Sequence, residues 1–319
     1  MSLSKFLLRR VTAIVFLLFL VSILVFIGCE VLPGDVAQVA LGMFATPENV
    51  AALRTQLGLD EPAAMRYASW LGGLLFQGDW GMSIVSRQPV TMMIGERLGN
   101  TALLAAVTTL VAVPLAVGLG IVMAITNGGW IDRVLTMIVL ALSATPEFLV
   151  AAVLVLAFAL HLGWLPTISY LSPGASFADT VRALILPAGT LTLVVAAQIA
   201  RMTRSIITNV LSYPYIEMAM LKGLPVRRIV ARHALINAVG PIANVVALNV
   251  AYMVSGIVVV ETIFAYPGLA RLMIDAVQSR DFPLIQACAL IFCAAYVVLI
   301  LIADVVARLC DPRAARGRG

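Results

Sequence analysis

The chain has 319 residues, of which 62% are hydrophobic and only 12% are charged, and its mean hydropathy is +1.04. Because about a quarter of the residues of a soluble domain are charged, this composition excludes an ordinary water-soluble protein and indicates a chain surrounded largely by lipid. The net charge of +5 does not indicate a nucleic-acid binder, since the basic residues cluster beside apolar runs and form no basic and aromatic stripe.

The first apolar run, residues 11–29, follows three basic residues, Lys5, Arg9 and Arg10. Such a run is either a membrane span or a cleaved signal sequence, and "FIGC" ending at Cys29 resembles a lipoprotein processing site. The run is longer than a usual signal core, and Phe26 and Ile27 are bulky for such a site. We therefore expect a membrane-spanning helix, with a signal sequence as the alternative.

Residues 30–100 form a long segment between the first two apolar runs. Turn signals occur at "LPGD", "LGLDEP" and "GDWG". Between them, residues 62–76 are mostly apolar and predict an interfacial helix, with Trp70 and Trp80 at the depth of the lipid headgroups.

Five further apolar runs are long enough to cross about 30 Å of hydrocarbon, and each must be helical to satisfy its backbone. Four are free of charge, and the run at 134–160 is interrupted only by Glu147. The five runs are 101–126, 134–160, 183–200, 242–260 and 284–303. A surface helix opened by Pro267 is also predicted, with one apolar face made of Leu269, Leu272, Met273, Ala276 and Val277.

Four cysteines, Cys29, Cys288, Cys293 and Cys310, show no metal-ligand spacing. Three of them lie in or beside the last apolar run, so we expect small core residues and no disulfide framework.

Residues 201–240 form a basic segment between two apolar runs. Pro214 is well placed as a first helical residue, and the helix should stop at Gly223, because Pro225 prevents continuation. A second, basic helix can start at Val226 and return to the membrane, reaching Pro241. This segment either docks a soluble partner or only fixes topology and contacts anionic lipid.

The distribution of Lys and Arg predicts the orientation. The larger share lies in the amino terminus, the loop with Arg133, the segment 201–232 and the carboxyl-terminal tail, which fall on one side. The other side has fewer basic residues and most of the acidic ones. By the positive-inside rule, both termini should be cytoplasmic.

The segment at 217–223 resembles the "EAA…G" signature of permease subunits of ATP-binding-cassette (ABC) importers, through Glu217, Ala219 and Gly223. The spacing to Pro241, with "RHALINAVGP" at its end, resembles the dipeptide, oligopeptide and nickel branch. Further similar motifs are "GDWGMS", "GWLPT", "VVVETIFAYPGLARLMIDAVQSRDFPLIQ" and the terminal "DP". The long segment after the first span is similar to that of the first of two permeases. Met218, Gly240 and Glu147 depart from the usual family residues.

This resemblance implies an all-α membrane protein with six transmembrane helices and the type I ABC importer permease fold. The implied organisation is an N-terminal span at 1–30, a periplasmic loop at 31–97, a permease core at 98–305 and a cytoplasmic tail at 306–319. The implied partners are a homologous second permease, two ATPases that handle ATP and Mg, and a periplasmic solute-binding protein, in a bacterial inner membrane.

The resemblance assigns contact with the ATPases to the helix before Gly223. The residues expected there are Glu217, Met218, Ala219, Met220, Leu221, Lys222 and Gly223. This chain itself has no G-x-x-x-x-G-K-[ST] motif, so we expect it to bind no cofactor. Peptides are the substrate class that the resemblance favours, while nickel, glutathione, opines and some sugars stay open.

Polar residues within the apolar runs are candidates for the translocation pathway. These are Ser143, Thr145, Glu147, Gln198, Asn244, Asn249 and Ser255. Polar residues in a bundle more often only join helices by hydrogen bonds. Glu147 differs, because an ionised carboxylate mid-membrane costs about 2.5–3.5 kcal/mol. We expect it to be protonated, or to face water, a cation or a substrate amine.

Two other classes of protein fit the sequence less well. A secondary transporter would also have several spans and a buried carboxylate, but it typically shows internal repeats, and none is found. A membrane enzyme is less well supported, because His161 and His233 are far apart and neither H-E-x-x-H nor G-x-S-x-G occurs.

Overall fold

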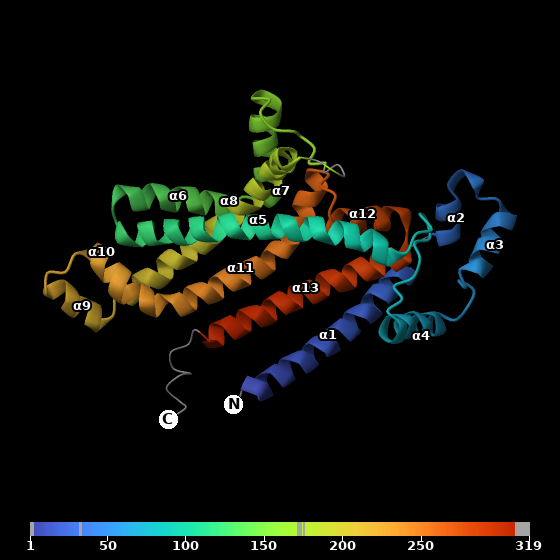
Figure 1. Cartoon of the computed structure of the whole chain (residues 1–319), viewed down its shortest axis with the longest axis horizontal. Coiled ribbons are helices and arrows are strands. Elements are labelled where there is room, and N and C mark those ends of the chain that lie inside the picture. Colours follow the sequence, from blue (N-terminus) through green and yellow to red (C-terminus); the bar gives the residue numbers. More distant parts are fainter. Residues whose placement is uncertain (1–2, 32–33, 171–173, 175, 310–319) are drawn as a thin grey trace. The chain divides into compact units, whose positions relative to one another are not determined.

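Helices account for nearly all of the chain in the computed structural model, which describes residues 3–31, 34–170, 174 and 176–309 (Figure 1). Within these residues, strand pairing is limited to an isolated bridge between Met82 and Pro89. The expectation of an all-α protein is confirmed. Cys29, Cys288 and Cys293 are free thiols, and Cys310 lies outside the described residues.

Five of the described helices are long and apolar enough to cross a membrane. They are α1 (Leu3–Val31), α5 (Val90–Ile125), α8 (Phe177–Leu211), α11 (Leu235–Ile263) and α13 (Phe282–Leu309). α1, α8, α11 and α13 each contain one of the charge-free runs predicted above and extend beyond it, and α5 covers the run at 101–126 except for its last residue, Thr126. Pro114, Pro187 and Pro241 lie inside α5, α8 and α11, as is tolerated in membrane helices whose neighbours satisfy the freed backbone groups.

The expectation of a single helix over 134–160 was wrong. The run is divided into α6 (Trp130–Ala144) and a second helix formed by α7 (Glu147–Leu154) and η3 (Val155–His161), which is bent from α6 by 108°. The cause is Pro146, which disfavours helical backbone at Thr145, and Thr145 is extended with ψ 128°. The described part of the chain therefore has five continuous candidate spans, or six if this bent pair counts as one broken span.

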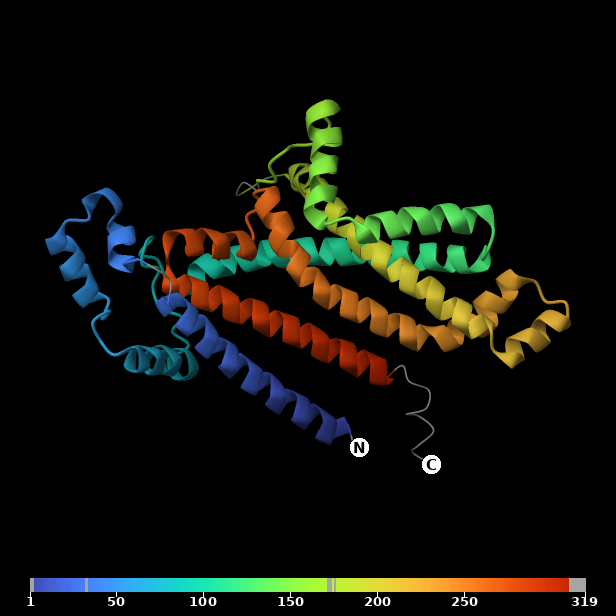
Figure 2. The ribbon, with the colours of Figure 1, turned by 180° about the vertical axis from the view of Figure 1, so that it is seen from behind.

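The chain divides into two units, the first of which combines Met1–Thr101 with Pro267–Val297. In this unit, α1 runs beside the first part of α13 (Figures 1 and 2). Its other elements are α2 (Val36–Leu41), η1 (Gly42–Phe44), α3 (Pro47–Gln56), α4 (Ala63–Gly72), η2 (Gly73–Gln77) and α12 (Leu269–Ser279).

Capping residues explain where the short helices of the first unit begin. Asp35 caps α2 by accepting from the Ala37 N–H at 2.9 Å, and Thr46 caps α3 with Pro47 as its first residue. The predicted helix over 62–76 is confirmed by α4 and η2. Pro267 does not open α12, which begins at Leu269 after Gly268 as its N-cap.

A buried network ties the loop before α5 to the turn between α12 and α13. Asp281 and Ser83 are each 2% exposed. The Ser83 hydroxyl donates to one Asp281 carboxylate oxygen, and the Ile84 N–H donates to the other at 3.1 Å. Beside it lies the apolar core of this unit, which consists of Val90, Ile94, Leu269, Leu272, Ala276, Leu284, Ala287 and Cys288.

The second unit comprises Ala102–Tyr266 and Val298–Gly319, and α8 lies at its centre. This helix packs against α6, α7 and α11, and most of its residues between Ala183 and Ala200 are buried. Two short helices, α9 (Pro214–Leu221) and α10 (Val226–Ile229), lie beyond the adjoining ends of α8 and α11 (Figure 2). From α10 the backbone continues through η4 (Val230–Ala234) directly into α11.

Candidate functional site

The segment that connects α8 to α11 folds as the sequence predicts. Pro214 is the first residue of α9, and the helix ends two residues before Gly223. Gly223 has φ +77°, a left-handed conformation that suits glycine and lets the chain reverse after a single short helix. The basic return helix begins at Val226, as expected.

One face of α9 is held by the protein and another is exposed. Ile216 is completely buried, whereas Met218 is 57% and Leu221 is 76% exposed. The Tyr215 hydroxyl accepts a hydrogen bond from Asn237 Nδ2 of α11 at 3.1 Å. Because positions 215, 218 and 221 share one side of a helix, α9 presents an apolar stripe, which we call the α9 stripe and define as Tyr215, Met218 and Leu221.

The remaining residues predicted for this site are placed as follows. Lys222 and Gly223 are exposed. The backbone of Glu217, Ala219 and Met220 lies within α9, but their side chains lie outside the described part of the structure. An exposed apolar stripe on a helix that is anchored from its other side is typical of a docking surface.

The second candidate site lies at the break between α6 and α7. Glu147 is the first residue of α7, directly after Pro146. A cavity of about 370 Å³ opens here, between the break, α8 and α11. It is lined by Ser143, Thr145, Pro146, Glu147, Phe148, Val194, Gln198 and Val259. Four of the seven predicted pathway residues therefore meet in one place.

The polar groups of this cavity are mainly hydrogen-bond acceptors. The Ser143 and Thr145 hydroxyls donate to the carbonyls of Leu140 and Ala141, at 3.1 and 2.7 Å. Their donor hydrogens are thereby used within α6, while their lone pairs stay available. Together with the Glu147 carboxylate, this arrangement suits a ligand that carries N–H donors and a positive charge.

Gly256 of α11 brings the backbone of that helix close to Glu147. A methyl group on Gly256 would lie 2.7 Å from Glu147 Oε1, so any side chain at this position would force the Glu147 carboxylate to move. We did not predict this residue from the sequence. A glycine between Ser255 and a run of β-branched residues is the signal that could have identified it.

The other three pathway candidates do not line this cavity. Asn249 is buried, and its Nδ2 donates to the Val245 carbonyl of its own helix at 2.8 Å. Asn244 is half-buried and Ser255 is exposed. Asn249 therefore behaves as a polar residue whose hydrogen bond is formed within the helix bundle, and it does not line this cavity.

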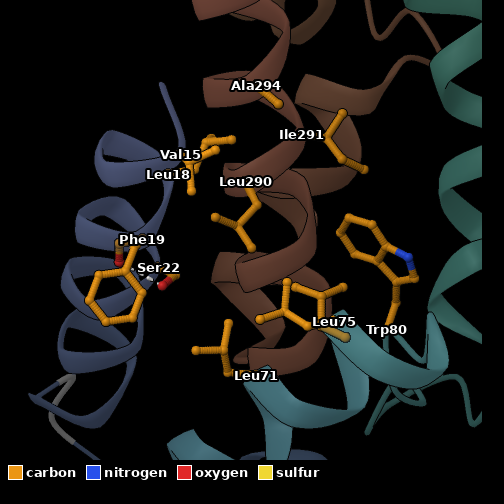
Figure 3. Close-up of a pocket in the computed structure, with 11 residues that line it drawn as sticks. Val15, Leu18, Phe19, Ser22, Leu71, Leu75, Trp80, Leu290, Ile291 and Ala294 are labelled. Atoms are coloured by element: carbon orange, nitrogen blue, oxygen red, sulfur yellow. Dashed lines mark hydrogen bonds between the residues drawn. The ribbon is translucent and has the colours of Figure 1, made fainter. Parts of the chain in front are cut away.

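A larger cavity of about 470 Å³ lies in the first unit, between α1, the α4–η2 helix and α13 (Figure 3). Its lining is apolar apart from Ser22 and Trp80. The Ser22 hydroxyl is engaged with the Phe19 carbonyl at 2.7 Å and the Tyr67 hydroxyl at 2.8 Å. This cavity therefore offers little to a polar solute.

The described residues contain no group of three or more His, Cys, Asp or Glu side chains that could hold a metal ion.

Two family models together cover most of the chain. Residues 116–316 match the binding-protein-dependent transport system inner membrane component, and residues 3–105 match the N-terminal region of such membrane components.

Curated relatives resemble the chain over nearly its whole length. It is 35% identical to a probable peptide ABC transporter permease protein, y4tP, of Sinorhizobium fredii. The 308 aligned residues cover 97% of this chain and 98% of that protein. The glutathione transport system permease protein GsiC of Escherichia coli K12 has the same identity and coverage.

Among solved structures, the chain resembles the inward-facing MetNI methionine ABC transporter. The TM-score is 0.53 with 16% identity, over 69% of this chain and 97% of that one, so this likeness concerns the fold alone. The chain thus belongs to the family of binding-protein-dependent transport system inner membrane components, the multi-pass, non-catalytic permease subunits of ABC importers.

Proposed function

We propose that this chain is one of two permeases of a peptide importer, with both termini in the cytoplasm. The second permease is homologous, two separate ATPases bind ATP and Mg, and a periplasmic binding protein delivers the solute. The peptide assignment rests on the relatives that transport peptides and glutathione. The positive-inside distribution of Lys and Arg supports the orientation.

The observation that carries this proposal is the α9 stripe. Ile216 fixes α9 to the permease while Met218 and Leu221 point away from it, so the helix can enter a groove of the ATPase and move the spans with it. Glu217 adds a charged contact with the ATPase surface, and Gly223 ends the docking helix. When ATP closes the ATPase dimer, α9 moves with it, and the permease passes between inward-open and outward-open states.

The cavity at Glu147 receives the peptide in this proposal. A peptide with a free amino terminus carries an ammonium group, which has three donors and no acceptor. The acceptors of Ser143, Thr145, Glu147 and Gln198 complement such a group. Gln198, which lies in the cavity itself, Asn244 and Ser255 are proposed as further pathway positions, whereas Asn249 bonds to its own helix.

A secondary transporter in which the basic segment serves only topology is not favoured, because the chain belongs to the permease family of ABC importers. A segment that served only topology would require basic residues but no exposed apolar side chains, so it would not explain the α9 stripe.

Purification of the tagged permease, expressed together with its partner subunits in mild detergent, tests the proposal. We expect the second permease and two copies of the ATPase to be identified by mass spectrometry. Met218→Asp with Leu221→Asp should lose the ATPases and keep the second permease. The control Met43→Asp alters a fully exposed methionine of η1 and should keep both. Loss of neither subunit, or of both together, in the α9 variant would contradict the docking role.

A further inference from the structure

A bidentate ion pair joins α6 to α8 near the end of α8 that leads to α9. Arg204 Nε lies 2.7 Å from Asp132 Oδ1, and Arg204 Nη2 lies 2.7 Å from Asp132 Oδ2. The Asp132 side chain is 4% exposed and that of Arg204 is 29% exposed. Two parallel charge-assisted bonds fix both the distance and the relative rotation of the two helices.

The surroundings of Asp132 hold the pair in one geometry. The Gly128 N–H donates to Oδ2 at 3.0 Å, and the Thr136 hydroxyl donates to Oδ1 at 3.3 Å. Arg204 Nη2 also donates to Asn127 Oδ1 at 3.2 Å. The carboxylate lies in the first turn of α6, where the helix dipole favours negative charge. Each carboxylate oxygen of Asp132 thus accepts two hydrogen bonds.

Stability alone is a weak reason for such a pair, because desolvation of both charges offsets much of their attraction. A fixed position for the two helices relative to each other is a better-supported use. The adjacent residue Thr203 makes a second close contact, since a methyl group on Gly120 of α5 would lie 2.6 Å from Thr203 Cβ. Residues 203 and 204 therefore attach α8 to α5 and to α6 within a single turn.

The position of the pair in the chain connects the two candidate sites. Beyond Arg204, α8 continues to Leu211 and is followed almost at once by α9. Beyond Asp132, α6 continues to Ala144, where the break brings Glu147 to the cavity. A displacement of α9 that moves α8 must then move α6 as well, provided that Asp132 and Arg204 stay bonded.

We infer that Asp132 and Arg204 are positioning residues that transmit the movement of α9 through α8 to the Glu147 cavity. The inference rests on the proposed function, since it assigns the route by which that function is coupled. It concerns neither ATP hydrolysis nor peptide binding directly. Breaking the pair should therefore separate ATP consumption from transport.

The test uses the complete transporter in proteoliposomes with radiolabelled tri-alanine and radiolabelled glutathione as probes. The quantity measured is peptide taken up per ATP hydrolysed, for Asp132→Asn, Arg204→Gln and the double variant. Only transporter that elutes fully assembled from size-exclusion chromatography is reconstituted. Arg201→Gln, which removes an exposed arginine of the same helix, is the control for loss of charge.

We expect each single variant to lower the uptake per ATP about five- to tenfold, with ATP hydrolysis maintained. The double variant should fall no further, because the two residues act as one unit. Arg201→Gln should match the wild type. Arg204→Lys keeps the charge and loses the bidentate geometry, so its uptake per ATP should lie between that of the wild type and that of Arg204→Gln. This variant also provides a test if a neutral variant fails to assemble.

A merely structural pair would lower the amount of assembled transporter and leave the uptake per ATP unchanged, and this result would overturn the inference. Losses that multiply in the double variant would also overturn it. Wild-type transporter that hydrolyses ATP but takes up neither probe would instead overturn the proposed function, together with the route assigned here.

Discussion

The carboxylate of Glu147 packs directly against the backbone of Gly256: a methyl group on Gly256 would lie 2.7 Å from Oε1 and 2.9 Å from Oε2. Glu147 belongs to α7 and Gly256 to α11, so this contact joins the broken span to a continuous one. The orientation of the carboxylate in the cavity therefore depends on a residue more than a hundred positions away.

Gly256→Ala should displace the Glu147 side chain and weaken its contact with a substrate ammonium group. A hydrogen bond to a charged group contributes about 1.5–3 kcal/mol, so uptake of free tri-alanine relative to N-acetyl tri-alanine should fall about tenfold or more. Glu147→Gln should have the same effect. The measurement is a comparison of the two initial uptake rates in proteoliposomes.

Gly189→Ala is the matched control, because a methyl group at this glycine of α8 would meet no atom within 4 Å. It should leave the ratio of free to acetylated peptide uptake at the wild-type value. If Gly256→Ala and Gly189→Ala change that ratio equally, the Glu147 carboxylate does not recognise the amino terminus.

Ile216→Ala should loosen α9, whereas Leu221→Ala should not. Ile216 is completely buried, so its truncation costs about 2–5 kcal/mol through lost burial and a cavity. Leu221 is 76% exposed, and such surface changes stay within about 0.5 kcal/mol. Hydrogen exchange of α9 in the purified permease should accelerate in the Ile216 variant alone. Equal acceleration in both would show that α9 is not anchored through Ile216.

Asp281→Ala should destabilise the first unit, because it leaves the Ser83 hydroxyl and the Ile84 N–H without their acceptor. Each buried orphaned group costs about 1–3 kcal/mol. The control is Asp275→Ala, which breaks an exposed pair with Arg271 on α12 and should cost no more than about 0.5 kcal/mol. The measurement is the thermal stability of both variants in detergent. A similar loss of stability in Asp281→Ala and Asp275→Ala would contradict the role assigned to the buried network.

The pair of Asp35 and Arg54 predicts how the segment after α1 responds to pH. Burial acts to raise the pKa of the Asp35 carboxyl, but hydrogen bonds from Arg54 at 2.7 Å and from the Ala37 N–H outweigh it and lower the pKa below its ordinary value. A lowered pKa contributes stability that is present above about pH 3.9, the unfolded value, and is lost as the pH falls through the native value.

Hydrogen exchange of α2 and α3 should therefore be constant between about pH 7 and pH 5 after correction for the intrinsic rate. Protection should decline only when the pH falls below about 4. In Asp35→Asn the protection should be lower at pH 7 and insensitive to pH across this range. A decline that begins near pH 6 would assign the pH dependence to another group.

Local signals in the sequence predicted the elements that depend on local chemistry. Pro214, Gly223 and Pro225 determine where α9 begins and ends, and the structure agrees at both ends. The five charge-free runs became helices because lipid leaves a backbone no other way to satisfy its hydrogen bonds. The break at Pro146 was missed, since hydropathy is continuous across it and hides the effect of proline on the preceding residue.

Contacts between distant residues were beyond reach of the same reasoning. Asp132 and Arg204 are separated by 72 positions, and nothing in the sequence indicates that they pair. Polar residues in the apolar runs were recognised as candidates, but their helical phase did not reveal that Ser143, Thr145, Glu147 and Gln198 share a cavity while Asn249 bonds to its own helix.

The most direct test of the account is peptide uptake by the complete transporter in proteoliposomes with ATP enclosed on the side of the ATPases. We predict uptake of labelled tri-alanine or glutathione that requires the binding protein, ATP and an intact α9 stripe, and that is unaffected when ion gradients are dissipated. Uptake by the permease alone, driven by an ion gradient and indifferent to ATP, would contradict the account and identify a secondary transporter.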